Sequence, residues 1–223
     1  MPLSQRTWKF LRRRGSSSPS PDAVLFDAAV LVDSSAAPAA GDRAADLVPG
    51  TIARHAFQHP SHEAALLGLI TERKWVDGVR RRLAEEVGTV PASAAVRAWR
   101  AERGHLNGAV ADVVRRVQDS GVRCAVLANA TDSLHTVLNA HRLNVEAFPS
   151  AELAVTMPSP LAFVAVADRM GLHPEHMFFA AAQPVAVTGA RAAGMEAGSA
   201  AQPSKLRARL ADLGIPVRVL AAA

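Results

Sequence analysis

The spacing of hydrophobic positions changes twice along the chain, and each change indicates a different kind of structure. Residues 23–26 form a continuous apolar run that ends at Asp27. Such a run without alternation is typical of a strand that is buried on both faces. From about residue 39 to 106 the apolar positions follow helical spacing, with no strand indicated. Beyond about residue 107, helical stretches alternate with short apolar runs.

The middle segment contains two predicted helices. Residues 62–87 place their apolar side chains on one face, and Gly88 suits the position just past the end of that helix. Residues 92–103 form the second helix, which Gly104 ends. The segment is therefore expected to pack as a small helical body.

The remainder of the chain predicts a sheet flanked by helices. We expect helices over residues 110–119, 133–141, 160–171, 184–193 and 205–213, and strands over 123–127, 145–148, 177–180 and 217–220. Ser159 and Pro160 suit the N-cap and first position of the third of these helices. Strand–helix alternation predicts an α/β fold, a Rossmann-like doubly wound parallel sheet. Ligands bind such sheets at the carboxyl ends of the strands, where Asp27, Asn129 and Ala181 would lie.

These patterns divide the chain into three parts. Residues 1–21 form a basic flexible tail, residues 22–38 plus 107–223 form the α/β core domain, and residues 39–106 are a helical insertion. Gly, Ser and Pro dominate residues 15–21, as in flexible linkers. The basic stretch before them is either a disordered terminus or an anchor for a partner or an anionic surface. No apolar region of the kind found in secretion signals follows its arginines.

Composition narrows the class of protein. Of the 223 residues, 49% are hydrophobic, which is enough for a sizeable core. The longest apolar runs are much shorter than the roughly 20 residues that a membrane span requires. We therefore expect a cytoplasmic protein without a membrane span. Cys124 is the single cysteine, so an internal disulfide is excluded, and its apolar neighbours predict an inert core thiol.

The net charge of +5 comes from the tail. The first fourteen residues contain no acid and five basic residues, Arg6, Lys9, Arg12, Arg13 and Arg14. Of the 25 basic residues in the chain, the other 20 balance the 20 acidic ones. A nearly neutral body argues against nucleic acid as a partner.

Four short segments carry a resemblance to a known superfamily. They are AVLFD at 23–27, AVLAN at 125–129, MPSP at 157–160 and MFFAAA at 177–182. Their order and their positions after the predicted strands make the set specific. Over residues 22–221 the chain resembles the haloacid dehalogenase (HAD) superfamily, in the branch with a helical cap inserted after the first strand. The resemblance implies a hydrolase fold whose aspartate nucleophile attacks phosphorus or carbon.

The resemblance also implies five catalytic features, of which four are replaced by apolar residues. Asp27 matches the nucleophile. The other positions are Ala29 for the general acid and base, Ala128 for the phosphate-binding Ser or Thr, Met157 for the Lys, and Ala181 with Ala182 for the acidic pair that holds Mg²⁺. The sequence therefore keeps the strands and helices of the family and lacks most of its polar chemistry.

The missing charges predict loss of catalysis. Mg²⁺ prefers several oxygen ligands, and Asp27 alone is a poor site, so we predict no metal and no cofactor. A phosphate dianion would meet Asp27 with neither Mg²⁺ nor Lys between them, which is unfavourable in a low-dielectric cleft. The dehalogenases of the family need no Mg²⁺ and would tolerate Ala29. They still resemble the phosphatases in requiring the Ser or Thr, the Lys and a fourth-strand acid.

The leading hypothesis is a catalytically inactive HAD-like protein, a pseudoenzyme that acts by binding in an accessory, regulatory or scaffold role. Its partner would be another protein or a second copy of the chain, bound through the cap. One alternative is a residual or repurposed hydrolase that uses Asp27 with cap residues Glu72, Arg73, Lys74 or Asp77. Another is a small-molecule sensor with an apolar cleft.

The candidate ligand cleft consists of Asp27, Asn129, Thr131, Asp132 and Met157. Asp27 is either a cap for the loop after its strand or a surviving nucleophile. The three polar residues after the second strand form either a turn with an N-cap or a set of ligand contacts. Met157 either packs against the apolar patch left by the alanines or contacts a ligand. His55, His59 and His62 have spacings of four and three, but Pro60 interrupts them, so we predict no metal site there.

Overall fold

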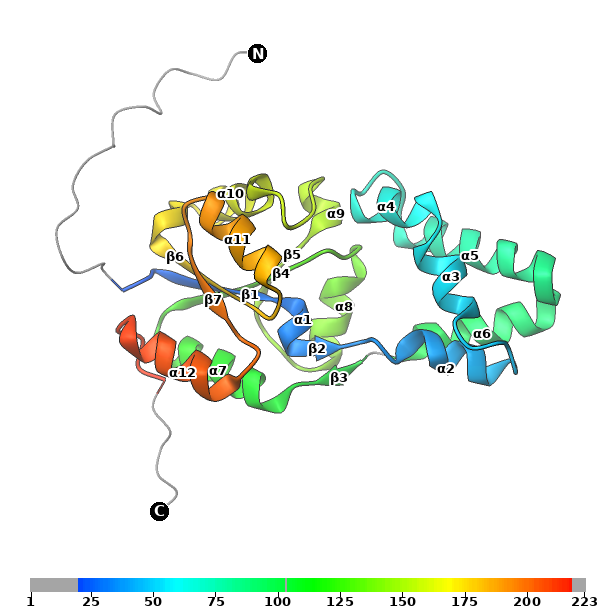
Figure 1. Cartoon of the computed structure of the whole chain (residues 1–223), viewed down its shortest axis with the longest axis horizontal. Coiled ribbons are helices and arrows are strands. Elements are labelled where there is room, and N and C mark those ends of the chain that lie inside the picture. The colour runs from blue at the N-terminus through cyan, green and yellow to red at the C-terminus, as the bar shows by residue number, and fades with distance from the viewer. Residues whose placement is uncertain (1–19, 103, 218–223) are drawn as a thin grey trace, which may run out of the picture.

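The computed structural model describes residues 20–102 and 104–217, and a five-stranded parallel sheet lies at its centre (Figure 1). The strand order is β5-β4-β1-β6-β7. The strands are β1 (Ala23–Asp27), β4 (Arg123–Ala128), β5 (Glu146–Pro149), β6 (Met177–Ala181) and β7 (Glu196–Ser199). All five residues of β1 are buried, as expected for the middle strand of a covered sheet. The predicted α/β Rossmann-like fold is confirmed.

Helices cover both faces of this sheet. On one face lie α1 (Ala28–Leu31), α7 (Gly108–Asp119), α8 (Ser133–Ala140) and α12 (Pro203–Asp212). On the other lie α10 (Pro160–Arg169) and α11 (Pro184–Ala192). Successive residues of β1 point to opposite faces, so Val24 and Phe26 join the first layer and Leu25 joins the second. The sheet is therefore doubly wound.

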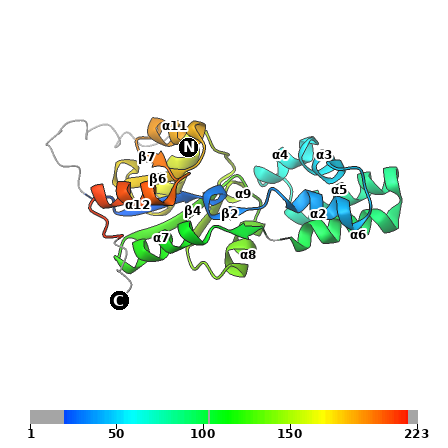
Figure 2. The ribbon, with the colours of Figure 1, turned by 60° about the horizontal axis from the view of Figure 1, so that its bottom comes forward.

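Five helices between the first two sheet strands form a body that we call the helical unit. They are α2 (Ala37–Ala44), α3 (Thr51–Phe57), α4 (Pro60–Leu66), α5 (Glu72–Val87) and α6 (Thr89–Ala101). Figures 1 and 2 show the helical unit beside the core. It has its own hydrophobic cluster around Trp75, Leu83 and Trp99. An antiparallel pair, β2 (Val32–Asp33) and β3 (His105–Leu106), joins the two bodies. No strand was expected at this position, and two residues are too few for a periodic signal.

The helix predicted over residues 62–87 is two helices. The chain leaves α4 at Leu66, and Gly68 has a φ of +71°, which interrupts helical geometry. Thr71 then caps α5 by accepting a hydrogen bond from the Lys74 amide, 3.3 Å away. The predicted end of α5 at Gly88 is confirmed, since this residue has a φ of +89°.

Four further elements differ from the sequence prediction. The short helices α1 and α9 (Ser150–Leu153), the 3₁₀ helix at Pro174–His176 and strand β7 were not expected. The sequence of β7, EAGS, is short and lacks β-branched residues, so it carries no strand signal. The strand expected over residues 217–220 lies outside the described residues except for Val217, and most of the basic tail also lies outside them.

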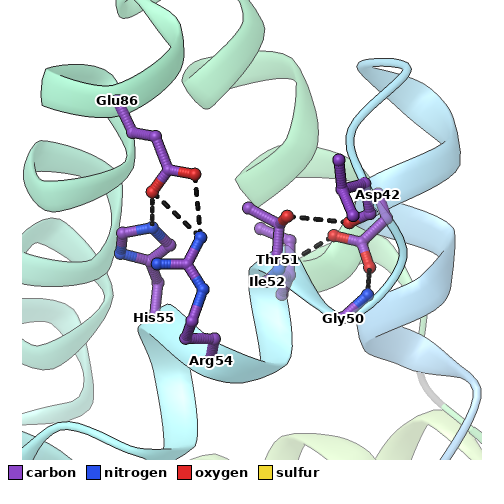
Figure 3. A network of polar contacts seen from close by, with 8 residues as sticks. Asp42, Gly50, Thr51, Ile52, Arg54, His55 and Glu86 are labelled. Carbon is purple, nitrogen blue, oxygen red and sulfur yellow. Dashed lines mark hydrogen bonds and ion pairs between the residues drawn. The ribbon is translucent and has the colours of Figure 1, made fainter.

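Buried hydrogen bonds tie the helical unit together around Asp42 on α2 (Figure 3). Its carboxylate accepts from the amides of Gly50 at 2.7 Å and Ile52 at 2.8 Å, at the start of α3. Helix N-termini favour such an anionic acceptor because their first amides lack partners inside the helix. Nearby, Glu86 of α5 pairs with Arg54 and His55 of α3, each at 2.8 Å. The exposed ion pairs add little stability compared with the buried acceptor.

Two predictions about composition are tested by this arrangement. No helix among the described residues is long and apolar enough to cross a membrane. Cys124 lies half-buried on β4, and its Sγ is 3.7 Å from the carbonyl oxygen of Val114. Burial raises the pKa of this thiol to about 12, so it stays protonated at neutral pH. The prediction of an inert thiol agrees with that environment.

Candidate functional site

A cleft of about 760 Å³ lies between the helical unit and the edge of the sheet where the strands end. From the core it is lined by segments that follow β1 and β4 and by residues 157–158. From the helical unit it is lined mainly by the side chains of Phe57, His62, Trp75, Trp99 and Arg100. The volume is in the range of small-molecule sites in proteins.

Asp27 ends β1 at the base of this cleft and is 6% exposed. Its Oδ1 accepts a hydrogen bond from the Ala29 amide at 3.0 Å, so it caps the short helix α1. Burial raises the pKa of Asp27, and the hydrogen bond from Ala29 opposes this only in part. Among the described residues, no ion pair involves this carboxylate. The interpretation of Asp27 as a cap is confirmed, and its carboxylate also faces the cleft.

We expect Asp27→Asn to stabilise the protein at pH 7–8 by on the order of 1 kcal/mol, because the amide keeps the cap without a buried charge. A raised pKa means that the folded protein holds this proton more tightly than the unfolded chain does. Stability therefore falls as the pH rises from the ordinary aspartate range through the raised pKa. The difference in stability between Asp27→Asn and the wild type should decrease as the pH is lowered towards 4. Thermal unfolding of both proteins from pH 4 to 8 measures this difference. A variant that is less stable than the wild type at pH 8 would contradict the expectation.

The Asn129 side chain forms two hydrogen bonds with the backbone of Met157. Its Nδ2 donates to the Met157 carbonyl at 2.8 Å, and its Oδ1 accepts from the Met157 amide at 2.7 Å. Met157 itself packs against the hydrophobic cluster of the α10–α11 face. Both residues line the cleft, but the Asn129 amide group is committed to the backbone.

Thr131 and Asp132 have different positions in the turn before α8. Thr131 lines the cleft and is buried, with its Oγ1 2.9 Å from the Ser133 hydroxyl. Asp132 occupies the N-cap position without a side-chain cap bond, is exposed, and does not line the cleft. Of the predicted cleft set, the structure therefore brings Asp27, Asn129, Thr131 and Met157 together in the cleft lining and leaves Asp132 outside it. The turn interpretation holds, although Thr131 rather than Asp132 accepts from the Ser133 amide.

The positions of the acidic pair that would hold Mg²⁺ in the resembled family, Ala181 and Ala182, offer no ligands here. Ala181 is fully buried at the end of β6, and Ala182 is exposed beside it. Ala128, at the position of the phosphate-binding Ser or Thr, ends β4. In the part of the chain that the structure describes, no group of three or more His, Cys, Asp or Glu could hold a metal ion. The residues around Asp27 do not fit Mg²⁺, which requires near-octahedral oxygen ligation.

The helical unit presents other residues to the cleft than those expected. Arg73, Lys74 and Asp77 line a separate depression of about 270 Å³. Glu72 is hydrogen-bonded to Arg100, and Arg100 rather than Glu72 lines the main cleft. A catalytic set made from Asp27 and the four named cap residues is therefore not assembled in this structure.

The three histidines of the helical unit have three different environments. His55 pairs with Glu86, while Nδ1 of His59 accepts from the Ser61 amide at 3.1 Å and caps α4. His62 lies half-buried among aromatic rings, and this burial lowers its pKa. The three side chains therefore have separate partners.

Several cleft residues were not recognised from the sequence as parts of a site. Phe57, Trp75, Trp99 and Arg100 come from three different helices, so no linear spacing joins them. Ser150 was also missed: its hydroxyl donates to the Leu66 carbonyl at 2.8 Å and thereby links the helical unit to the core. Composition offered no signal for them, because the helical insertion holds three of the ten Phe and Trp residues of the chain, about its share of the length.

Comparison with known proteins relates this fold to one structural group. No protein-family model and no curated protein matches the chain. Among solved structures, a dehalogenase with an intermediate complex is similar over 86% of this chain and 98% of its own, with a TM-score of 0.67 and 17% identity.

Two other solved structures have a similar extent. A defluorinating L-2-haloacid dehalogenase covers the same shares, with a TM-score of 0.66 and 21% identity. A HAD family enzyme from Bacteroides thetaiotaomicron covers 79% of this chain and 92% of its own, with a TM-score of 0.62 and 17% identity. At these identities the likeness establishes a HAD-like fold.

Proposed function

We propose that this chain is a HAD-like protein of the helical-cap branch that binds a ligand in its cleft without hydrolysing it. The observation that carries the proposal is the isolation of Asp27. It is buried at the catalytic edge of the sheet, while the neighbouring strand ends and the 157–158 segment contribute Ala128, Ala181 and Met157. Hydrolysis in this fold depends on charge neutralisation at those positions.

The size and lining of the cleft favour a small molecule over a purely structural role. A cavity of about 760 Å³ with apolar walls and a few polar groups is the usual form of a ligand site. These features support a binding protein that acts as a small-molecule sensor. For the outer surface of the helical unit, the proposed partner is another protein or a second copy of the chain.

A hydrolase that uses Asp27 in a different manner is the competing proposal. Two observations favour it: the neighbours of this fold are described as dehalogenases and a HAD family enzyme, and Asp27 itself is present in the cleft. Its difficulty is the lack of a partner for the attack, because Asn129 is committed to Met157 and Arg100 to Glu72. Catalytic groups that act as a unit lose most of their effect when members are missing.

A panel of phosphate esters and 2-haloacids, assayed with and without Mg²⁺, distinguishes the two proposals. We expect the wild-type protein and Asp27→Asn to give the same background rate. The variant keeps the fold, so it reports contaminating enzyme. Turnover that is present in the wild type and lost in Asp27→Asn would establish the hydrolase.

A further inference from the structure

Four rings of the helical unit form a cluster on the wall of the cleft, which we call the aromatic box: Phe57, His62, Trp75 and Trp99. The centroid distances run from Phe57 to His62 at 5.1 Å, His62 to Trp75 at 5.2 Å, Trp75 to Trp99 at 5.5 Å and Trp99 back to Phe57 at 6.0 Å. Phe57 and Trp75 are also neighbours, at 6.2 Å, so the four rings pack directly against one another and a ligand can meet them only from the cleft side. All four belong to the cleft lining.

Core packing explains part of this cluster. Trp75 and Trp99 are each 5% exposed and belong to the hydrophobic core of the helical unit, and Trp75 donates its indole N–H to the Ala56 carbonyl. Core packing does not explain Phe57, which is 43% exposed in the cleft, or the half-buried His62. The exposed part of Phe57 is therefore the part of the cluster that a ligand in the cleft can contact.

The core side of the cleft supplies a carboxyl group, Asp27, that forms no ion pair among the described residues. Asp27 is more than nine-tenths buried, and the Ala29 amide is the hydrogen-bond donor that it has among the described residues. A buried carboxylate without a cation is unfavourable, so a positively charged ligand would remove this cost.

The other ionisable residues of the cleft also favour a positively charged ligand. Its ionisable lining residues, among those described, are Asp27, Asp33, His62 and Arg100. Arg100 is held by Glu72 and lies over the Trp99 ring, with its Cζ 5.7 Å from the centroid. His62 is uncharged at neutral pH because burial lowers its pKa. The lining therefore contains two carboxyl groups, Asp27 and Asp33, and one cationic side chain, Arg100, which is already paired with Glu72.

We propose that the cleft binds a small organic cation, an alkylated ammonium group on an apolar body, which lies against the cleft side of the aromatic box and has Asp27 as the counter-charge. This inference rests on the proposed binding function. Alkylammonium groups bind the negative faces of aromatic rings and need no set of oxygen ligands. Mg²⁺ does need such a set, which these residues do not supply.

Isothermal titration calorimetry of the full chain tests this with matched probes. Choline and benzyltrimethylammonium are the cations, 3,3-dimethyl-1-butanol is the uncharged isostere of choline, and inorganic phosphate is the anion. We expect choline to bind at least roughly tenfold more tightly than its isostere, as a desolvated cation–π contact implies. Phosphate should not bind. Equal affinity for the isostere, preference for phosphate, or no binding of either cation would overturn the proposal.

Variants of Phe57 and Asp27 test whether the helical side and the core side of the cleft each contribute to the binding. Phe57→Ala and Asp27→Asn should each weaken binding of benzyltrimethylammonium by about tenfold. Val90→Ala serves as the control, because Val90 is an exposed apolar residue of the helical unit that does not line the cleft. A loss in Val90→Ala equal to that in Phe57→Ala would also overturn the proposal.

The same preparations separate this inference from the proposed function. Failure of both cations to bind, without hydrolysis of the substrate panel, would remove the cation proposal and leave a binding protein of another specificity. Hydrolysis that depends on Asp27 would remove the proposed function, whatever the cations do.

Discussion

Replacing Asp42 with alanine is expected to lower the free energy of unfolding by about 2–4 kcal/mol, because two amides lose a charged acceptor. Asp42 is 3% exposed, and its two carboxylate oxygens accept from Gly50 and Ile52 (Figure 3). Alanine leaves both amides without this partner, one of them in a buried hydrogen bond. The loss should appear as earlier unfolding in denaturant titrations followed by circular dichroism.

Asp77→Ala is the matched control for this prediction. Asp77 also belongs to the helical unit, but its side chain is 53% exposed and pairs with Arg80 within α5. Its removal should change stability by less than about 0.5 kcal/mol. If Asp42→Ala were as mild as Asp77→Ala, the view that a buried carboxylate organises α2 and α3 would be wrong.

Gly68→Ala is expected to loosen the contact between the helical unit and the core and to cost about 2–4 kcal/mol. A Cβ at this position would lie 2.2 Å from the Ala151 carbonyl oxygen, so the two segments must move apart. The residue also has a φ of +71°, where any side chain is strained. The hydrogen bond from Ser150 to Leu66 spans the same contact and should be lost. Small-angle X-ray scattering would then show a larger radius of gyration.

Gly121→Ala separates the effect of backbone strain from the effect of the clash with Ala151. Gly121 has a φ of +83°, but nothing lies within 4 Å of the position of an added Cβ. It should show only the backbone strain of about 1–2 kcal/mol, with no change in the radius of gyration. An unchanged radius in Gly68→Ala as well would contradict the role given to the Ala151 contact.

The sheet could be predicted because its central strands are buried on both faces. The apolar runs that form β1, β4 and β6 need no partner to be recognised, and glycines and caps locate the helix ends between them. β7 and the β2–β3 pair carry no such signal. They are short, and their hydrogen bonds rather than their side chains define them as strands.

The candidate site could be predicted only on its core side. Asp27, Asn129 and Met157 follow strands whose order fixes where their ends meet, so the fold brings them to one edge. The helical side depends on how α3, α5 and α6 pack, and periodicity does not encode that packing. Arg100 and the aromatic box therefore emerged from the structure, whereas Glu72, Arg73, Lys74 and Asp77 were the wrong choices for this wall.

The buried carboxylate links stability to function in this account. Asp27 is expected to lower stability at neutral pH, and it caps a helix that an asparagine could also cap. Residues that cost stability are often kept for function. This expected cost supports the proposal that Asp27 serves ligand binding.

A single-turnover assay tests the central claim, binding without turnover, most directly. The protein is held in excess over para-nitrophenyl phosphate or 2-chloropropionate, with Mg²⁺ present, so that even one slow event per molecule is detected. We predict equal product from the wild type and Asp27→Asn over several hours. Product that forms with the wild type and is absent with Asp27→Asn would contradict the account and identify Asp27 as a working nucleophile.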